Sequence, residues 1–439
     1  MLSSRPQQLK SLIQTRDTRS VRVFLVGVEL KSRTGADVRE SLDELEELAE
    51  TAGTQIVGEG VQKMAVPVAA TYIGPGKAEE FAGFCKANDV DTIIFDDELS
   101  PAQTRNLEKI FGVKIMDRTA LILEIFGQRA RTREGKLQIE HAQLKYLLPR
   151  LTRFSSHLSR QRGSTGSIGG EGESQLEADR RKISERIEKI SSELDKVRSQ
   201  RETQRAGRQR SNWPLASIVG YTNAGKSTLL NKLTGSAVLA EDKLFATLDP
   251  TTRRLKLPTN QNVLLTDTVG FIKKLPHGLV EAFKATLEEV VQADLLLHVV
   301  DISHPQAEEQ IAAVDAVLKE IGAEGKPVLM VFNKMDKLNG SGALNRFQEK
   351  FPHSVGISAM SGEGVSYLLA EMGTQLRPTR EFLDLRIPHE QSAVIARLHK
   401  VGQVVERRYN SRTARFKVRI PPQHHGEFAP YILNKQQLA

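Results

Sequence analysis

The chain reads Gly220-Tyr221-Thr222-Asn223-Ala224-Gly225-Lys226-Ser227 near its centre, and this stretch decides the fold. It matches G-x-x-x-x-G-K-[ST], a loop whose backbone N–H groups surround the phosphates of a nucleotide. Lys226 would reach the outer phosphates as a point charge, and the Ser227 hydroxyl would coordinate magnesium. An apolar run precedes the loop and a helical pattern follows it, an order that places the phosphates at a helix N-terminus. The stretch predicts a P-loop nucleotide-binding domain.

A second motif, Asn333-Lys334-Met335-Asp336, follows an apolar run and selects the base. Its carboxylate, Asp336, can accept hydrogen bonds from the N1 and N2 donors of guanine, while Asn333 contacts the other polar edge and the Lys334 stem covers the ring. Adenine lacks those donors, and a carboxylate left unpaired costs roughly 1–3 kcal/mol or more. Farther on, Ser358-Ala359-Met360 suits a backbone contact to the guanine carbonyl. We therefore expect GTP and GDP as ligands.

Between these motifs lies Asp267-Thr268-Val269-Gly270. Asp267 is placed to hold the magnesium shell, and the Gly270 N–H to sense the γ-phosphate. Four motifs in this order, each at a strand end, predict a GTPase. Ras-like enzymes place a glutamine directly after the third motif, but Phe271 stands here. An apolar ring cannot orient water, so we expect slow intrinsic hydrolysis and identify no certain catalytic side chain. Help would come from a switch residue, a bound cation or the partner.

Composition bounds the class of protein. The 439 residues are enough for two or three domains, each with its own core. The single cysteine, Cys85, excludes an internal disulfide and fits a reducing cytosol; a small buried hydrophobe is favoured over a reactive thiol. No apolar run approaches the ~20 residues of a membrane span, and no signal peptide is apparent. We expect a cytoplasmic protein, with peripheral membrane association left open.

The positive charge is concentrated in one segment. Residues 129–210 hold 20 Lys/Arg and 11 Asp/Glu, whereas the whole chain has a net charge of +8. Such a concentration favours a polyanionic partner over a solvated helical face. The glycine-rich stretch 163–170 is either a flexible linker or a mobile tip that probes RNA. The candidate RNA-binding residues are Arg153, Arg160, Arg162, Arg180, Arg181 and Lys182.

Apolar spacing predicts a helical hairpin in the same segment. Leu176, Ile183, Ile187, Ile190, Leu194 and Val197 recur at 7, 4, 3, 4 and 3, a heptad seam. An earlier helix carries Leu137, Leu144, Leu148, Leu151 and Leu158, and Pro149 should kink it. A polar, arginine-rich stretch at 199–212 is expected to be a tether. Heptads this short favour an intramolecular hairpin, so we expect a monomer.

The predicted fold class is α/β, in four parts. Residues 1–128 form an N-terminal α/β nucleotide-binding-like domain, because strands alternate with helices. Residues 129–212 form the basic antiparallel helical hairpin with its glycine-rich tip and tether. Residues 213–377 form the GTPase domain, with a mixed sheet flanked by helices, and 378–439 a small α+β domain of order β-α-β-β. Gly74-Pro75-Gly76-Lys77 could bind an anion at a helix start, but a plain turn is favoured.

Several stretches resemble the HflX family of ribosome-acting GTPases. They are 219–229, Asp267 to Ile272, and outside the GTPase core 126–138 and 172–181, so the likeness covers roughly residues 20–377. One departure is Gly170-Glu171-Gly172-Glu173, where a proline is expected before the last pair. A further matching stretch, Leu244-Phe245-Ala246-Thr247-Leu248-Asp249-Pro250-Thr251, is the switch. The resemblance implies nucleotide contacts from Phe245, Ala246, Thr247, Leu248 and Asp249, and favours Thr247 over Thr252 as the magnesium ligand.

The resemblance also implies the partner, the large ribosomal subunit and its RNA, with a hairpin tip that reaches towards its catalytic centre. Our hypothesis is a GTPase that binds this subunit in its GTP form and promotes dissociation or rescue of stalled or idle ribosomes. A ribosome-assembly or RNA-remodelling GTPase is the alternative, and Asn333 to Asp336 argues against a kinase or ATPase. Mg²⁺ is the expected cofactor. Asn223 resembles an asparagine that coordinates potassium in some GTPases, so K⁺ is a second expected ion. Arg253 or Arg254 is a weaker candidate for an arginine finger.

Overall fold

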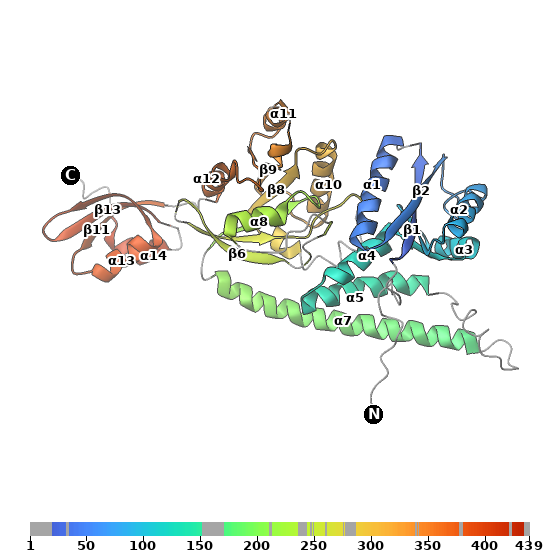
Figure 1. Cartoon of the computed structure of the whole chain (residues 1–439). Helices are drawn as coiled ribbons and strands as arrows, with labels where there is room; N and C mark the ends of the chain where they lie inside the picture. Colours follow the sequence, from blue (N-terminus) through green and yellow to red (C-terminus); the bar gives the residue numbers. More distant parts are fainter. Residues whose placement is uncertain are drawn as a thin grey trace. The chain divides into compact units, whose positions relative to one another are not determined.

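The computed structural model describes residues 20–31, 35–151, 171–209, 213–235, 244–245, 248, 250–259, 261–274, 276, 287–338, 340, 342–376, 381–420 and 424–433, without the side chains of 171–176, 198, 200–209 and 381 (Figure 1). The chain divides into two compact units, Met1–Leu368 and Leu369–Ala439. Both combine helices with sheets, which confirms the predicted α/β class. No helix among the described residues is long and apolar enough to cross a membrane.

The first sheet is parallel, with the strand order β2-β1-β3-β4. Its strands are β1 (Arg22–Leu30), β2 (Gln55–Met64), β3 (Thr92–Phe95) and β4 (Lys114–Asp117), and the helices between and after them are α1 (Gly35–Thr51), α2 (Pro75–Ala87), α3 (Pro101–Phe111) and α4 (Arg118–Arg129). The predicted strand–helix alternation is therefore present. Ser100 caps α3 with a complete capping box and proline in its first turn, as its sequence predicts.

Each face of this sheet is covered by two helices (Figure 1). The apolar stripe of α1, with Leu42, Leu45 and Leu48, packs with α4 on one face. On the other face α2 and α3 bury Phe81, Leu107 and Cys85. Burial raises the pKa of the Cys85 thiol to about 11, which agrees with a buried hydrophobe.

A buried ion network lies at the carboxyl end of β3. Arg118, at the start of α4, is 2% exposed and donates to Asp96 at 2.8 Å and to Glu44 of α1. Asp96 is itself 3% exposed and accepts a hydrogen bond from the Ser41 hydroxyl at 2.7 Å. Burial opposes the charge on Arg118, whereas Glu44 and Asp96 raise its pKa overall. The guanidinium therefore ties α1, α4 and β3 together.

We expect Arg118→Met to lower the free energy of unfolding by about 3 kcal/mol, because it removes the buried cation that Glu44 and Asp96 share and leaves Asp96 with Lys274 as its only cation among the described residues. Urea denaturation followed by circular dichroism measures the change. Arg105→Met on the exposed surface of α3 is the matched control and should stay within about 0.5 kcal/mol of the unmodified chain. Equal losses in the two variants would contradict a special role for Arg118.

The helical hairpin consists of α5 (Arg133–Leu147) and the 39-residue α7 (Glu171–Gln209). Leu137, Leu144 and Ile190 form its buried seam, with Ile183, Ile187 and Leu194 packed against them, so part of the predicted heptad contact is present. Arg186 adds a two-pronged ion pair with Glu140 at 2.7 and 2.8 Å. The glycine-rich tip at 163–170 lies outside the described residues.

Two details of the hairpin differ from the sequence prediction. The first helix does not continue as a kinked helix through Pro149: it ends at Leu147 and passes into a 3₁₀ turn, Leu148–Arg150, because proline removes a helical N–H donor. The stretch predicted as a tether is mostly helical, since α7 runs on to Gln209. Polarity alone misled the prediction, because no glycine-proline breaker interrupts this stretch and a solvated helix tolerates charge on all sides.

The GTPase sheet has the order β10-β9-β8-β5-β7-β6, and only β6 is antiparallel to its neighbour. Its strands are β5 (Leu215–Gly220), β6 (Thr251–Lys256), β7 (Asn262–Asp267), β8 (Leu295–Asp301), β9 (Val328–Asn333) and β10 (Ser354–Gly356). Helices α8 (Lys226–Thr234), α10 (Ala307–Glu320), α11 (Gly342–Lys350) and α12 (Val365–Gln375) and the 3₁₀ turn Met335–Lys337 complete it. Strands β5, β8 and β9 are almost wholly buried, as parallel strands covered on both faces should be.

The second unit contains an antiparallel sheet of order β11-β13-β12. It is built from β11 (Glu381–Pro388), α13 (Ser392–Val401), β12 (Gln403–Tyr409) and β13 (Thr413–Ile420), followed by α14 (His425–Phe428) and the 3₁₀ turn Ala429–Tyr431. The described order is the predicted β-α-β-β. Leu385, Phe416 and Leu398 lie at the centre of its own core.

Candidate functional site

The phosphate loop connects β5 to α8 in a conformation that depends on glycine. Gly225 has φ +91°, and a Cβ there would meet the side-chain amide nitrogen of Asn333 at 2.2 Å. Asn333 uses that amide to donate to the Ala224 carbonyl at 2.8 Å and accepts from the Ala359 N–H at 2.9 Å. One buried side chain thus joins the first, second and last predicted motifs. The four motifs lie together because all four follow the carboxyl ends of parallel strands, β5, β7, β9 and β10, at one sheet edge.

Lys226 is held inside the loop. It is 7% exposed, and its Nζ donates to the Tyr221 carbonyl at 2.7 Å. Burial lowers the pKa of Lys226 to about 8; Asp267 opposes this shift, and Lys334 adds to it. The ammonium is therefore desolvated and short of negative charge, a deficit that the phosphates of a nucleotide would fill.

Nucleotide binding is expected to take up protons above pH 8. Phosphate contact favours the charged ammonium and so raises the pKa of Lys226 again, so proton uptake per GDP should be substantial at pH 8.5 and should fall steeply towards pH 7. Calorimetric titration in two buffers of different ionisation enthalpy measures this uptake. Lys226→Arg stays charged and reports the contribution of other groups. Equal uptake in both proteins would contradict the assignment.

The predicted magnesium residues meet at the same place. The Ser227 hydroxyl donates to an Asp267 carboxylate oxygen at 2.7 Å, and Asp267 is fully buried at the end of β7. Oxygen donors of this kind fit Mg²⁺, which usually takes one or two protein ligands and completes its shell with phosphates and water. No cluster of three His, Cys, Asp or Glu among the described residues offers a metal site made of protein alone. Thr247, the other predicted ligand, lies outside the described residues.

The base-recognition residues lie next to the phosphate loop. Lys334 adopts a left-handed conformation with φ +64° and pairs with Asp301 at 2.7 Å, which fixes its stem. Asp336 follows in an exposed 3₁₀ turn and has no hydrogen bond or ion pair to another described residue. Met360 is 83% exposed beside Ala359. The carboxylate is therefore available for the two guanine donors, and an apolar side chain stands at the edge of the same region.

The switch stretch is described only in part. Phe245, with φ +54°, donates its N–H to the Thr222 hydroxyl at 3.0 Å, and its ring packs on Phe126 of α4 with centroids 4.6 Å apart. Leu248 is buried, whereas Ala246, Thr247 and Asp249 lie outside the described residues. Thr252, the alternative to Thr247, shares a hydrogen bond with Thr266 at 2.9 Å.

Neither arginine-finger candidate points to a catalytic role. Arg254 stacks over the Trp213 ring at 4.4 Å and donates to Asn262 from β7, so it is engaged in holding the sheet edge. Arg253 is exposed and reaches only the carbonyl of its neighbour, Thr252, at 3.4 Å. A structural role suits both.

Phe271 contributes backbone hydrogen bonds to the site, and its side chain does not orient water. It is 2% exposed, accepts from the Thr222 N–H at 2.7 Å and donates to the Gly220 carbonyl at 3.1 Å. These two hydrogen bonds join the segment that follows Asp267-Thr268-Val269-Gly270 to the phosphate loop. The buried ring can contribute no hydrogen bond to an attacking water, as the sequence predicts.

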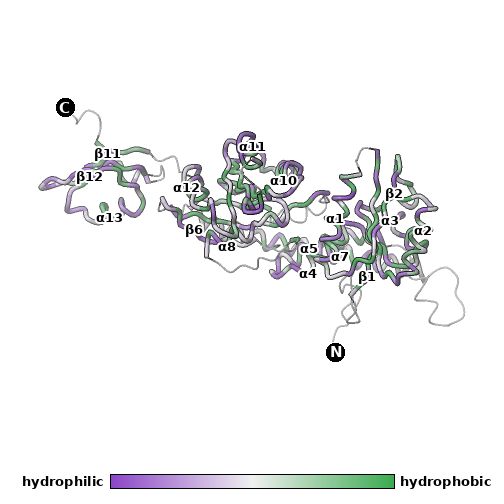
Figure 2. Tube along the Cα trace, turned by 45° about the horizontal axis from the view of Figure 1, so that its top comes forward, coloured by the Kyte–Doolittle hydropathy of each residue, from purple (hydrophilic) through white to green (hydrophobic). Residues whose placement is uncertain are grey.

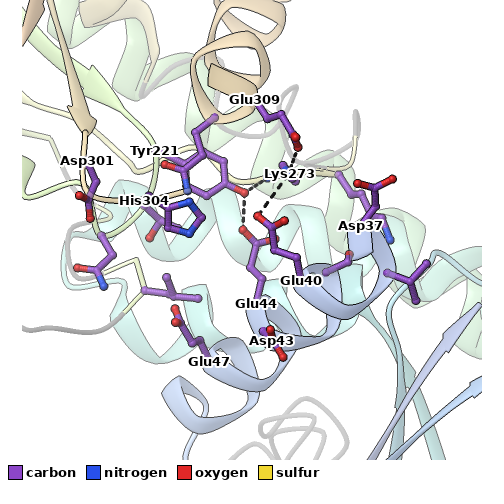
Figure 3. Close-up of a pocket in the computed structure, with 17 residues that line it drawn as sticks. Asp37, Glu40, Asp43, Glu44, Glu47, Tyr221, Lys273, Asp301, His304 and Glu309 are labelled. Atoms are coloured by element: carbon purple, nitrogen blue, oxygen red, sulfur yellow. Dashed lines mark hydrogen bonds and ion pairs between the residues drawn. The ribbon is translucent and has the colours of Figure 1, made fainter. Parts of the chain in front are cut away.

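A cavity of about 450 Å³ lies between α1 and the phosphate loop (Figure 3), and sequence reasoning missed it. Tyr221 stands in its wall: the hydroxyl donates to Glu44 of α1 and accepts from the Lys273 N–H at 2.7 Å. Burial raises the pKa of Tyr221 far above its usual range. The carboxylates of α1 that line this cavity are Asp37, Glu40, Asp43, Glu44 and Glu47.

Two lysines that follow Gly270 pair with carboxylates near this cavity, one of which, Glu40, belongs to α1. Lys273 pairs with Glu309 at 2.7 Å and Glu40 at 3.7 Å, and Lys274 pairs with Asp96 and with Asp97 at 2.9 Å. Asp96 follows β3 near the point where the strand order reverses, which is where an open α/β sheet commonly binds ligands. Here Lys274 lies beside Asp96 at that point.

The possible anion site at Gly74 has no free donor at its first residue. The Gly74 N–H, which precedes α2, already donates to Gln62, and this suits a plain helix start.

The candidate RNA-binding residues are described in part. Arg180, Arg181 and Lys182 lie on α7, all exposed; Lys182 pairs weakly with Asp179 at 3.7 Å, and Arg180 donates to the Leu151 carbonyl at 3.2 Å. Arg153, Arg160 and Arg162 lie outside the described residues. The described three leave the positive surface open to solvent.

Family models match three successive parts of the chain, and solved structures share part of its sequence. Three family models match in order: "GTP-binding GTPase N-terminal" over residues 39–127, "GTP-binding GTPase Middle Region" over 129–208 and "50S ribosome-binding GTPase" over 216–334. A solved structure titled as the SsGBP and GDP complex is 27% identical, covering 81% of this chain and 98% of that one at a TM-score of 0.46.

Curated relatives share sequence over most of the chain. GTPase HflX of Lacrimispora saccharolytica is 47% identical over 88% of this chain and 90% of its own length. GTPase HflX of Escherichia coli is 44% identical over 87% of this chain and 90% of its own length. GTPase HflX of Akkermansia muciniphila is 40% identical over 94% of this chain and 97% of its own length. The GTPase domain and these relatives assign GTP hydrolysis to the chain. The chain belongs to the GTPase HflX family.

Proposed function

We propose that this GTPase binds the large ribosomal subunit in its GTP form, promotes dissociation or rescue of stalled or idle ribosomes, and leaves after hydrolysis. The observation that carries the proposal is the pairing of the phosphate-loop, magnesium and base-recognition residues with a buried Phe271 where a water-orienting side chain would stand. An enzyme so built turns over slowly alone and needs a partner to complete its site, as a molecular switch does.

The basic hairpin supports RNA as that partner. Its arginines and lysines outnumber its acids, and α7 keeps Arg180, Arg181 and Lys182 in solvent. The family model over 216–334 is described as a 50S ribosome-binding GTPase, and it names the large subunit. Phosphate contacts of this kind bind strongly and weaken steeply with salt.

The site residues are assigned proposed roles on their geometry. The loop 220–227 would hold the phosphates, with Lys226 neutralising charge and the Gly270 N–H reading the γ-phosphate. Ser227 and Asp267, joined at 2.7 Å, would hold Mg²⁺, which supplies charge neutralisation when bound. Asn333, Lys334 and Asp336 would select guanine. K⁺ is proposed as an additional ion on the resemblance of Asn223 alone, and the intramolecular hairpin seam supports a monomer.

GTP turnover with and without purified large ribosomal subunits tests the proposal. We expect stimulation of about tenfold or more at low salt, and a smaller effect at moderate salt. The variant Arg180→Gln/Arg181→Gln/Lys182→Gln should lose much of the stimulation and keep its basal rate, because Arg180 bonds to Leu151 and Lys182 pairs with Asp179, neither of them a residue of the nucleotide motifs. A rate unchanged by subunits would sink the ribosome partner. Stimulation by subunit precursors alone would favour an assembly factor.

A further inference from the structure

The C-terminal sheet has one face that no helix covers. Along β13 the side chains alternate: Phe416 and Val418 are fully buried with Leu398 of α13, and the residues between them point away from that core. In Figure 1 α13 and α14 lie on one side of this sheet. We name the other side the open sheet face; it comprises Phe382, Asp384 and Arg386 of β11, Gln403, Glu406 and Arg408 of β12, and Arg415, Lys417 and Arg419 of β13.

An unbroken row of arginines crosses this face. The strand register places Arg415 directly opposite Arg386 on one side and Arg408 on the other. Like charges on directly opposite residues destabilise a sheet. Such a row therefore lowers the stability of the fold unless an anionic group binds it. The hydrophilic colour of β12 in Figure 2 reflects the same concentration of charge.

The acids on the open sheet face do not neutralise it. Asp384 is occupied by Arg415 at 2.8 and 2.5 Å, and Glu406 is shared by Lys417 and Arg408, each at 2.7 Å. Arg386 and Arg419 are exposed and have no ion pair within the described part of the chain. Five cations against two carboxylates leave an excess of three positive charges, which an anionic partner would complement.

An exposed aromatic ring lies within this positive surface. Phe382 is 57% exposed and stands opposite Arg419 in the register of β11 and β13. An apolar ring costs free energy in water, whereas beside a guanidinium it forms a platform on which an unpaired base can stack. Antiparallel sheets with aromatic rings on an open face bind single-stranded RNA in this way, and the flanking cations take the phosphates.

We propose that the open sheet face binds single-stranded RNA, with Arg386 and Arg419 on phosphates and Phe382 under a base. This rests on the proposed ribosome-binding function and adds an RNA contact outside the hairpin, and its main test uses a free oligonucleotide without GTP, so its failure is distinguishable from failure of the ribosome proposal. The nearest competing occupant, an acidic protein segment, fits the charge but gives no reason for a bare aromatic ring among arginines.

The test measures fluorescence anisotropy of a fluorescein-labelled uridine 20-mer with the full-length chain. Because the hairpin also attracts RNA, both proteins compared carry Arg180→Gln/Arg181→Gln/Lys182→Gln. We expect Arg386→Gln/Arg419→Gln to weaken binding about tenfold at 50 mM salt and to reduce the slope of log Kd against log salt by about 1.4, as loss of two phosphate contacts predicts. Neither replacement orphans a carboxylate, so the fold should persist.

The matched control is Arg397→Gln/Lys400→Gln on the exposed side of α13, which removes the same charge from the same unit. It should stay within twofold of the parent. Phe382→Ala, which leaves the charge untouched, should weaken the uridine 20-mer about tenfold and a duplex of equal length much less. Identical affinity and slope for the arginine variant and its control would overturn the proposal. So would a variant that binds RNA normally but loses affinity for large subunits, an outcome that points to a ribosomal protein.

Discussion

Lys226→Met should lower kcat/KM for GTP by about 10³-fold. The ammonium is the buried charge that the outer phosphates meet, and removing one preorganised electrostatic contact from a transition state of this kind costs about 4 kcal/mol. Methionine keeps the length of the stem, so the loop stays packed. Steady-state phosphate release and GDP titration measure the two parts of the loss, turnover and affinity.

The stability of Lys226→Met separates this effect from misfolding. Burial lowers the pKa of Lys226, which means that the folded chain disfavours the charged ammonium below pH 8. The nucleotide-free variant should therefore melt at the same temperature as the parent or higher. Lys319→Met on α10, where the lysine side chain is 72% exposed, is the control and should leave both turnover and melting unchanged. A variant that melts earlier but binds GDP normally would contradict the assigned role.

The nucleotide motifs could be predicted from sequence because their geometry is local. Each of the first three follows a buried strand, and parallel strands deliver their carboxyl ends to one edge whatever the rest of the chain does. Asn333 illustrates the limit: the motif predicts its contact with guanine, but its bonds to Ala224 and Ala359 span 109 and 26 residues and appear only in the fold. The same holds for the core of the first sheet, whose strands and helices follow from apolar periodicity.

The acidic cavity could not be predicted in this way. Helix α1 carries an apolar stripe of leucines and a surface of carboxylates, which in sequence is indistinguishable from an ordinary solvated face. Only the tertiary fold brings Glu44 to Tyr221, residues 177 apart, and Lys274 to Asp96, 178 apart. The sequence of α1 does hold a signal, because its acidic residues far outnumber its single arginine. Nothing in the sequence, however, indicates which loop faces those acidic residues in the fold.

Asp336→Asn should weaken GTP binding by about 10³-fold and transfer the preference to xanthosine triphosphate. A carboxylate accepts from both guanine donors, and hydrogen bonds to a charged group are worth about 1.5–3 kcal/mol each. The asparagine carbonyl can still accept from N1–H, but its amide N–H now faces the donating 2-amino group, so one bond is replaced by a donor–donor contact and the other loses its charge. Xanthine carries a carbonyl in place of the 2-amino group and can accept from that amide. Competition between labelled GDP and each triphosphate measures the exchange.

This substitution tests base selection apart from phosphate binding and catalysis. Asp336 is exposed and makes no hydrogen bond or ion pair to another described side chain, so its replacement mainly removes what it offers to a ligand. Asp89→Asn, an exposed aspartate whose φ of +48° suits asparagine equally well, is the matched control and should bind GTP normally. If xanthosine triphosphate then supports turnover at the rate that GTP supports in the parent, selection and hydrolysis are separable. Loss of both nucleotides alike would instead place Asp336 in the architecture of the loop, against its exposed position.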